Sequence, residues 1–477
     1  MQIQVMPLII VIVYLIGMLC VGYFTNKFFI KGSEDYLVAG RRLGVFMLAA
    51  SLSANNVGGG SSVGVASRAF GDQWGISAGW YVLAAAIGVI PIAYFAPYIR
   101  KALAITIPEV VERRFGAPAG LITAILNATA LFCLTASQIL ASGTIVSALV
   151  GLDLSIAIFI AAIIVMVYTV MGGLFADAIS DLVQWLVIFL GLLIAVPFVI
   201  SGAGGWAAVK AALPPGHLNF TKVGFTQIFS LIIMFFVTFL SGPEIVSRFN
   251  AAEDEKTARK SALLSALLMG VYAFVPAFIG VVARAKFPDI DASQALVTAV
   301  FNLAPGWVAG LVSAAIISAT MSSADSDMLC ASSIIVKDIY QKYINPNIED
   351  RKIITLTRIF NVIIGLAGMF IALFKINIIT LNTFSFALRS AGPFAAFGLG
   401  LVWKNATKNA GILSIIGGSI AAVVWQILGE PYGILAIVFG AAISIIVFVL
   451  VTVIERSNGV SPAPSPYLTE DKKSIGL

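Results

Sequence analysis

Residues 54–62 read Ala54-Asn55-Asn56-Val57-Gly58-Gly59-Gly60-Ser61-Ser62. They interrupt an apolar segment that extends from about residue 44 to residue 70. Three successive glycines weaken a helix and expose its backbone, so we expect the helix to break here. A second interruption, Ser241-Gly242-Pro243-Glu244, falls inside the apolar segment 224–248, where Pro243 removes a backbone donor. The sequence therefore predicts two broken helices.

The chain around these interruptions is too apolar for a soluble protein of its size. Of its 477 residues, 60% are hydrophobic and only 11% are charged, and the mean hydropathy is +1.01. Apolar runs of about 20 residues, long enough to cross a bilayer, recur along most of the chain. We therefore predict an all-α, polytopic membrane protein with about 13 transmembrane helices, whose membrane partner is the lipid bilayer. The predicted spans are 7–26, 44–70, 76–98, 118–149, 153–171, 176–200, 224–248, 260–283, 306–334, 352–375, 377–402, 409–428 and 432–454.

Most of the 29 Lys and Arg residues fall in alternate loops between these spans. Because basic loops stay in the cytoplasm, the pattern predicts a multi-pass protein of the cell (inner) membrane, with its N-terminus outside and its C-terminus cytoplasmic. The first apolar run has no cleavage pattern after it and is expected to remain as a helix. The basic residues form short clusters and no continuous stripe, so no nucleic acid is expected as a partner.

The two interruptions divide the chain into repeated halves. Each half contains five predicted spans and opens with a broken helix, and an odd number of spans inverts the second half relative to the first. Inverted repeats with broken helices are typical of secondary transporters, whereas a pair of packing kinks is the simpler alternative. The predicted regions are an N-terminal outer helix and loop 1–43, a first repeat 44–200, an extracellular loop 201–223, a second repeat 224–402, two C-terminal helices 403–455, and a disordered cytoplasmic tail 456–477.

Oxygen-bearing side chains recur at helical spacing in the span 306–334. Ala319, Ser322, Ser323 and Ser326 are three or four residues apart, so their oxygens share one face. Oxygen ligands without nitrogen or sulfur suit a hard cation, although serines also pack closely between membrane helices. Carboxylates inside the bilayer need a cation or another partner.

Two carboxylates belong to the same argument. Asp181 lies in the predicted span 176–200, and Asp325 lies beside the serine face of the span 306–334. Asp325 and the neighbouring Asp327 lie either at membrane depth or in water at the cytoplasmic end of their helix, and the sequence leaves both placements open.

These features resemble the sodium/solute symporter family over about residues 7–455. The most specific piece is Gly172-Gly173-Leu174-Phe175-Ala176-Asp177-Ala178-Ile179-Ser180-Asp181-Leu182-Val183-Gln184, which is similar to the family's Gly-Gly…Asp…Gln signature. The stretch 242–249, Gly-Pro-Glu-Ile-Val-Ser-Arg-Phe, and the Ser-Ser…Asp-Ile-Tyr stretch that ends at residue 340 agree with it. The resemblance implies a leucine-transporter-like fold of five plus five helices, sodium (Na+) as the coupling ion, and alternating access.

The resemblance also implies a set of cation ligands. A sodium ion is expected at the carbonyls of Ala54, Val57 and Ala319 and the hydroxyls of Ser322 and Ser323. A candidate second cation site contains Asp181, Asp325 and Ser326. Some relatives have serine at position 325, and the aspartate here either strengthens a second cation site or converts it to a proton-linked one.

The expected function is sodium-coupled symport of a small organic solute, an amino acid or a carboxylate in preference to a sugar. Sugar-carrying relatives place Gln and Glu where this chain has Ser61 and Val82. The alternatives are a sugar or quaternary-amine symporter, a channel and a transporter-derived sensor. An enzyme is not expected, because the sequence shows no nucleophile–base pair. The candidate solute contacts are Asn55, Asn56, Ser61, Gln138 and Glu244, with Trp80, Phe236 and Phe239 as apolar walls.

Overall fold

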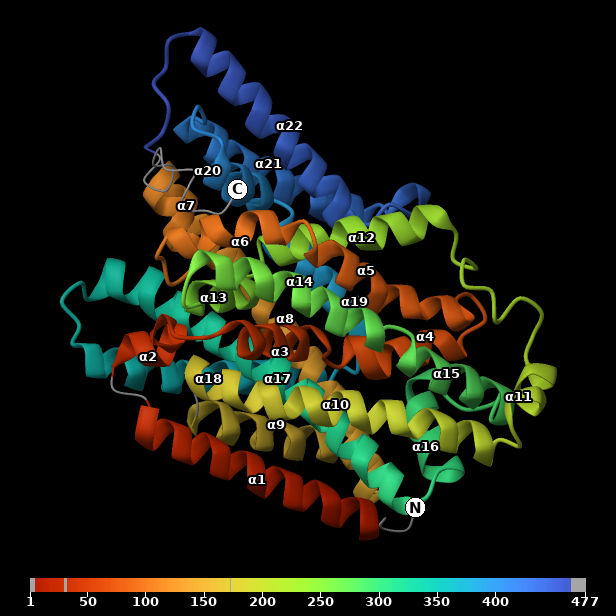
Figure 1. Cartoon of the computed structure of the whole chain (residues 1–477). Coiled ribbons are helices and arrows are strands. Elements are labelled where there is room, and N and C mark those ends of the chain that lie inside the picture. Colours follow the sequence, from red (N-terminus) through yellow and green to blue (C-terminus); the bar gives the residue numbers. More distant parts are fainter. Residues whose placement is uncertain (1–4, 30–31, 172, 465–477) are drawn as a thin grey trace.

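The protein is a bundle of α-helices in which no element of the described chain is a named strand (Figure 1). The computed structural model describes residues 5–29, 32–171 and 173–464. Gly172 of the signature and residues 465–477 of the predicted tail lie outside the described residues. The prediction of an all-α fold is confirmed.

The first half of the chain begins with α1 (Val5–Phe29), which packs against the outside of the bundle. The elements that follow are α2 (Ser33–Val38), α3 (Val45–Asn56), η2 (Gly60–Gly64), α4 (Val65–Phe70), η3 (Gly75–Gly79), α5 (Trp80–Val89), α6 (Ile92–Lys101), α7 (Ile107–Phe115), α8 (Ala117–Val150), α9 (Leu154–Met171) and α10 (Leu174–Gly202).

The second half starts after a loop that carries the short α11 (Trp206–Ala212). Its elements are α12 (Phe225–Leu240), α13 (Pro243–Ala251), α14 (Glu255–Tyr272), α15 (Val275–Lys286), α16 (Ala295–Leu303), α17 (Gly306–Ile334), η5 (Ile335–Ile344), α18 (Asp350–Ala372), α19 (Ile378–Ser390), α20 (Pro393–Val402), α21 (Lys408–Ile427) and α22 (Ala436–Ser457).

The first interruption lies where the sequence predicts it. Helix α3 ends at Asn56, and regular helical structure resumes at Gly60 in η2. The glycines are needed because other helices approach closely: a Cβ on Gly58 would lie 2.5 Å from Ser323 Oγ, and a Cβ on Gly59 would lie 2.5 Å from Ala141 Cβ. The break therefore brings backbone next to α17 and α8.

The second interruption is a bend of 54° between α12 and α13. Pro243 occupies the first turn of α13, where a missing backbone N–H costs nothing. Two further spans bend in the same way, by 54° before α6 and by 52° before α20, at Pro91 and Pro393. These two bends are not among the predicted interruptions.

The predicted number of 13 spans is not confirmed. Eight described helices are long and apolar enough to cross a membrane, and the number rises to 11 if each bent pair counts as one span. The two other predicted segments are the broken α3–η2–α4 unit and α9, which is shorter. The break divides the apolar length of the first of these segments, and α9 is a single short helix.

The centre of the bundle is α17, which packs against α8, α10 and α3 (Figure 1). Almost every residue of α17 is buried, including its serines and aspartates. The paired α21 and α22 pack outside α19 and α20. The described beginning of the tail returns to the bundle, because Ala463 is buried and its N–H donates to Ala406 O at 2.7 Å.

Candidate solute and cation site

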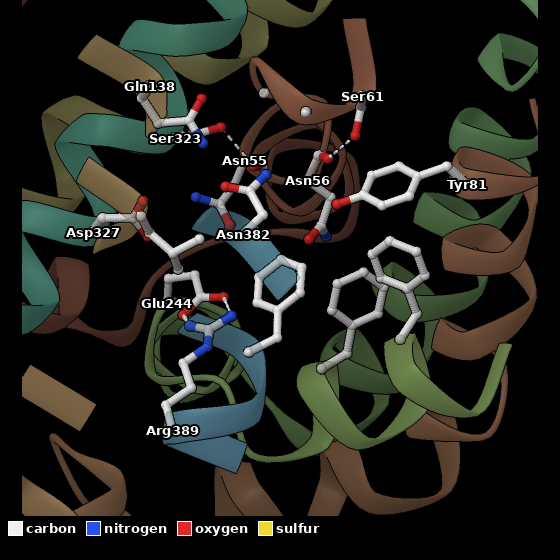
Figure 2. A pocket seen from close by; sticks show the side chains of 16 residues that line it. Asn55, Asn56, Ser61, Tyr81, Gln138, Glu244, Ser323, Asp327, Asn382 and Arg389 are labelled. Atoms are coloured by element: carbon white, nitrogen blue, oxygen red, sulfur yellow. Dashed lines mark hydrogen bonds and ion pairs between the residues drawn. The ribbon is translucent and has the colours of Figure 1, made fainter. Parts of the chain in front are cut away.

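A narrow cavity lies where the two broken helices face α8, α17 and α19 (Figure 2). Its lining combines aromatic side chains with a few polar and charged groups, as binding sites for small molecules do. Its charged residues are Glu244, Asp327 and Arg389; its polar residues include Asn55, Asn56, Ser61, Gln138, Ser323 and Asn382; and its aromatic residues are Tyr81, Phe235, Phe239 and Phe386.

The backbone of the first break is satisfied by neighbouring side chains. The N–H of Gly59 donates to Gln138 Oε1 at 2.8 Å, and the hydroxyl of Ser61 donates across the break to Asn56 O at 2.8 Å. Irregular backbone inside a membrane protein is stable only with such partners. Gln138 and Ser61 thus hold the edge of the cavity in place.

Ser323, one of the predicted sodium ligands, connects α17 to the end of α3 beside this cavity, while the full ligand set stays a prediction. Ser323 Oγ donates to Asn55 O at 2.7 Å and to Ala319 O at 3.1 Å, and it also lines the cavity. Ala54 and Val57 are fully buried at the end of α3. The oxygens of the α3 break and of α17 therefore converge from opposite halves of the chain, and carbonyls and hydroxyls suit a hard cation.

A buried polar cluster borders the other face of α17. Arg248, which is fully buried, donates to Asp177 Oδ2 and Asp181 Oδ2, both at 2.9 Å, and to Ser326 Oγ at 2.6 Å. Asp181 also accepts hydrogen bonds from the hydroxyls of Ser51 and Ser322. Asp181 therefore connects the charged cluster to a predicted sodium ligand.

The candidates for a second cation site belong to this cluster. Asp181 and Ser326 contact the guanidinium of Arg248, and Asp325, at 2% exposure, has one oxygen without a hydrogen-bond partner. Asp325 is buried at the centre of the bundle and not in water at a helix end. The second cation site itself stays a prediction.

The predicted solute contacts divide into two groups. Asn55, Asn56, Ser61, Gln138, Glu244 and Phe239 line the cavity, and Trp80 and Phe236 do not. The indole of Trp80 donates to Phe220 O at 2.8 Å, and the ring of Phe236 packs against Phe95 and Phe394.

Helix geometry explains why the neighbouring aromatic residues line the cavity instead. Phe235 and Phe239 are four residues apart and share a face of α12, whereas Phe236 lies about 100° around the helix from Phe235. Tyr81, next to Trp80, likewise faces the cavity (Figure 2). Of the three predicted aromatic contacts, Phe239 therefore lies on the face of α12 that lines the cavity, whereas Phe236 and Trp80 lie on other faces of their helices.

Several residues of the site were not assigned a role from the sequence. Asp177 and Arg248 both stand in the quoted motifs, and the spacing of four between Asp177 and Asp181 places both carboxylates on one face of α10. Asn382 and Phe386 of α19 carried no signal, because nothing in an apolar helix indicates which neighbour it faces. Asn382 Oδ1 accepts from Ser137 Oγ at 2.6 Å.

The chain is similar to known transporters over nearly all of its length. The sodium:solute symporter family profile matches residues 36–418. The chain is 27% identical to a sodium/proline symporter of Haemophilus influenzae, with 87% of each chain covered. It is also 27% identical to the high-affinity proline transporter PutP of Bacillus subtilis, with 95% of this chain and 98% of the relative covered.

Solved structures share the fold. A Na+-coupled sialic acid symporter in a substrate-bound, outward-open state superposes with a TM-score of 0.81 at 20% identity, covering 96% of this chain and 99% of that one. Mhp1, a nucleobase-cation-symport-1 family transporter, superposes with a TM-score of 0.59 at 15% identity, covering 92% and 97%.

The resemblance stated from the sequence motifs is confirmed by these matches, and so is sodium as the coupling ion. The broken helices, the converging oxygens and the matched residues lead to one conclusion: the chain belongs to the sodium:solute symporter family and is a multi-pass membrane protein that transports a small organic solute with sodium.

Proposed function

We propose that this chain carries a small amino acid, with proline as the first candidate, inward together with sodium by alternating access. The proposal rests on Ser323, because its side chain contacts two groups of residues at once. Its hydroxyl belongs to the oxygen cluster that joins Asn55 O to Ala319 O, and it also lines the solute cavity. The relatives named above as proline transporters supply the first substrate to test.

Coupling follows from this arrangement. A sodium ion at the oxygens of Ala54, Val57, Ala319, Ser322 and Ser323 bridges the broken helix to α17. Asn55, which lines the cavity, then has a fixed position, so the ion raises the affinity for the solute. The solute must raise the affinity for sodium by the same factor, because the coupling free energy is shared.

The direction of transport follows from the ion gradient and the membrane potential. A potential of 100 mV contributes about 2.3 kcal/mol for each charge that moves inward. Loss of sodium to a sodium-poor cytoplasm releases the bridge between the two halves and lets the cavity open to the other side.

A wide, open hollow lies on the predicted outer side of the molecule. It is lined by Trp74, Lys222, Thr383 and Glu430, among others. These residues belong to the ends and loops that the basic-residue pattern predicts to lie outside, and we propose that solute enters from this side.

The test is uptake of radiolabelled L-proline by proteoliposomes that contain the purified protein. We expect saturable accumulation with an inward sodium gradient, a further increase with an inside-negative potential, and little accumulation with a potassium gradient. Equal uptake with potassium would exclude sodium coupling, and a flux that does not saturate would favour a channel.

A further inference from the structure

Asp327 is a buried carboxylate in the solute cavity with no partner in the described part of the chain. Its residue is 3% exposed, it lines the cavity, and it takes part in no hydrogen bond or ion pair there (Figure 2). It lies one helical turn beyond Ser323, on the same face of α17. An ionised carboxylate in such a place is costly unless a cation meets it.

The basic side chains nearby already form ion pairs with other carboxylates. Arg389 Nη2 donates to Glu244 Oε1 at 2.7 Å, and its Nη1 donates to Glu244 Oε2, so this pair is bidentate and neutral. Arg248 is held by Asp177 and Asp181 in the cluster on the other face of α17. The charge of Asp327 is therefore not compensated by the residues that line the cavity.

The same cavity is also lined by the aromatic residues Tyr81, Phe235, Phe239 and Phe386. The ring centroids of Tyr81 and Phe235 are 5.0 Å apart, and those of Phe235 and Phe239 are 5.4 Å apart. Aromatic faces attract organic cations but supply no ligand for a metal ion. A carboxylate with an aromatic wall therefore favours an ammonium group over a bare sodium ion at this position.

We propose that Asp327 binds the protonated amine of the solute, through N–H···O bonds to its free carboxylate, and so selects amine-bearing solutes over nitrogen-free carboxylates. The inference rests on the proposed function only in placing the solute in this cavity. It adds the residue that recognises the solute and the chemical group that it recognises.

Binding to the purified full-length protein tests the selection. The unfolding temperature is measured in sodium and in potassium buffer with four probes: L-proline, L-alanine, pyrrolidine, which lacks the carboxylate, and cyclopentanecarboxylate, which lacks the nitrogen. We expect stabilisation by at least one of the amine-bearing probes and none by cyclopentanecarboxylate. The proposal is overturned if cyclopentanecarboxylate stabilises as well as the best amine, or if no amine stabilises the protein.

The same probes separate this inference from the proposed function. Stabilisation by pyrrolidine and not by either amino acid supports amine recognition and contradicts an amino acid as the solute. Sodium-dependent stabilisation by cyclopentanecarboxylate alone contradicts amine recognition and leaves sodium-coupled symport intact.

Asp327→Asn then tests the residue itself. The variant keeps the shape of the side chain and removes its charge, so the dissociation constant of the best amine probe should rise about 10- to 100-fold. Asp153→Asn removes the same charge from an exposed loop and should bind as the wild type does. Asp327→Glu should restore part of the affinity.

The sodium response separates a role in solute binding from a role in sodium binding. The stabilisation of Asp327→Asn by sodium alone should match that of the wild type, because the predicted sodium ligands are unchanged. If sodium still stabilises the variant and the amine binds within about twofold of the wild-type affinity, Asp327 does not recognise the solute. If sodium no longer stabilises the variant, Asp327 belongs to the sodium site and the assignment to the amine is wrong.

Discussion

Replacing Ser323 with alanine removes a hydroxyl that belongs both to the predicted sodium ligands and to the lining of the candidate solute cavity. The hydroxyl donates to Asn55 O at 2.7 Å and to Ala319 O at 3.1 Å, and its residue is 3% exposed. Water therefore has little access to replace it. The substitution should weaken sodium binding first and solute binding as a consequence.

The size of the effect follows from the buried oxygens. Loss of a buried polar partner costs about 1–3 kcal/mol. Since about 1.4 kcal/mol corresponds to a factor of ten, the sodium concentration for half-maximal uptake should rise about 5- to 150-fold. Because coupling is reciprocal, solute affinity should fall at limiting sodium and recover at saturating sodium.

The assay is solute uptake by proteoliposomes over a range of sodium concentrations, together with a sodium titration of the unfolding temperature without solute. Ser323→Thr keeps the hydroxyl and should retain most of the sodium affinity. Ser313→Ala is the matched control, because Ser313 is buried on the same helix and bonds only to Ala309 O, at 2.8 Å. A wild-type sodium requirement in Ser323→Ala would refute the proposed site.

Three other predictions concern stability and are checked by unfolding of the purified protein. Arg248→Ala leaves Asp177 and Asp181 buried without their cation, so it should lower the free energy of unfolding by about 3–5 kcal/mol. Lys352→Ala, which removes an exposed ion pair, should change this free energy little. Gly59→Ala forces a methyl group to within 2.5 Å of Ala141 Cβ, so it should lower the free energy of unfolding by about 1–3 kcal/mol. An unchanged unfolding temperature would show that α8 can move away from the break. Burial lowers the pKa of His217, whose Nε2 is bonded to Ala69 O at 2.8 Å. The neutral imidazole therefore contributes fully to stability above its ordinary pKa of 6.5. This contribution is lost as the pH falls toward the lowered pKa. The unfolding temperature should therefore fall as the pH drops below the ordinary pKa of 6.5, and less steeply in His217→Gln.

The two faces of α17 show what residue spacing alone can predict. Ser322 and Ser326 are four residues apart and both face the cluster around Arg248, and Ser323 lies beside the cavity, as does Asp327 one turn later. The spacing predicts that these faces exist, because it follows from the helical period. It does not say which face meets a solute and which meets an arginine.

The features that depend on local chemistry can be read from the amino-acid sequence. Apolar runs require lipid as the solvent, successive glycines and Pro243 break helices, and serines four residues apart, such as Ser322 and Ser326, share a helix face. Each of these follows from a short stretch of chain and its immediate surroundings.

Which helix faces meet depends on the packing of distant segments. In the described part of the chain this packing places Phe235 and not Phe236 in the cavity, pairs Glu244 with Arg389, and leaves Asp327 without a partner. These outcomes depend on the rotation of each helix about its axis and on contacts between residues that are far apart in the chain. In a bundle where nearly every surface is apolar, the local pattern does not fix that rotation, because the packing of the neighbouring helices sets it.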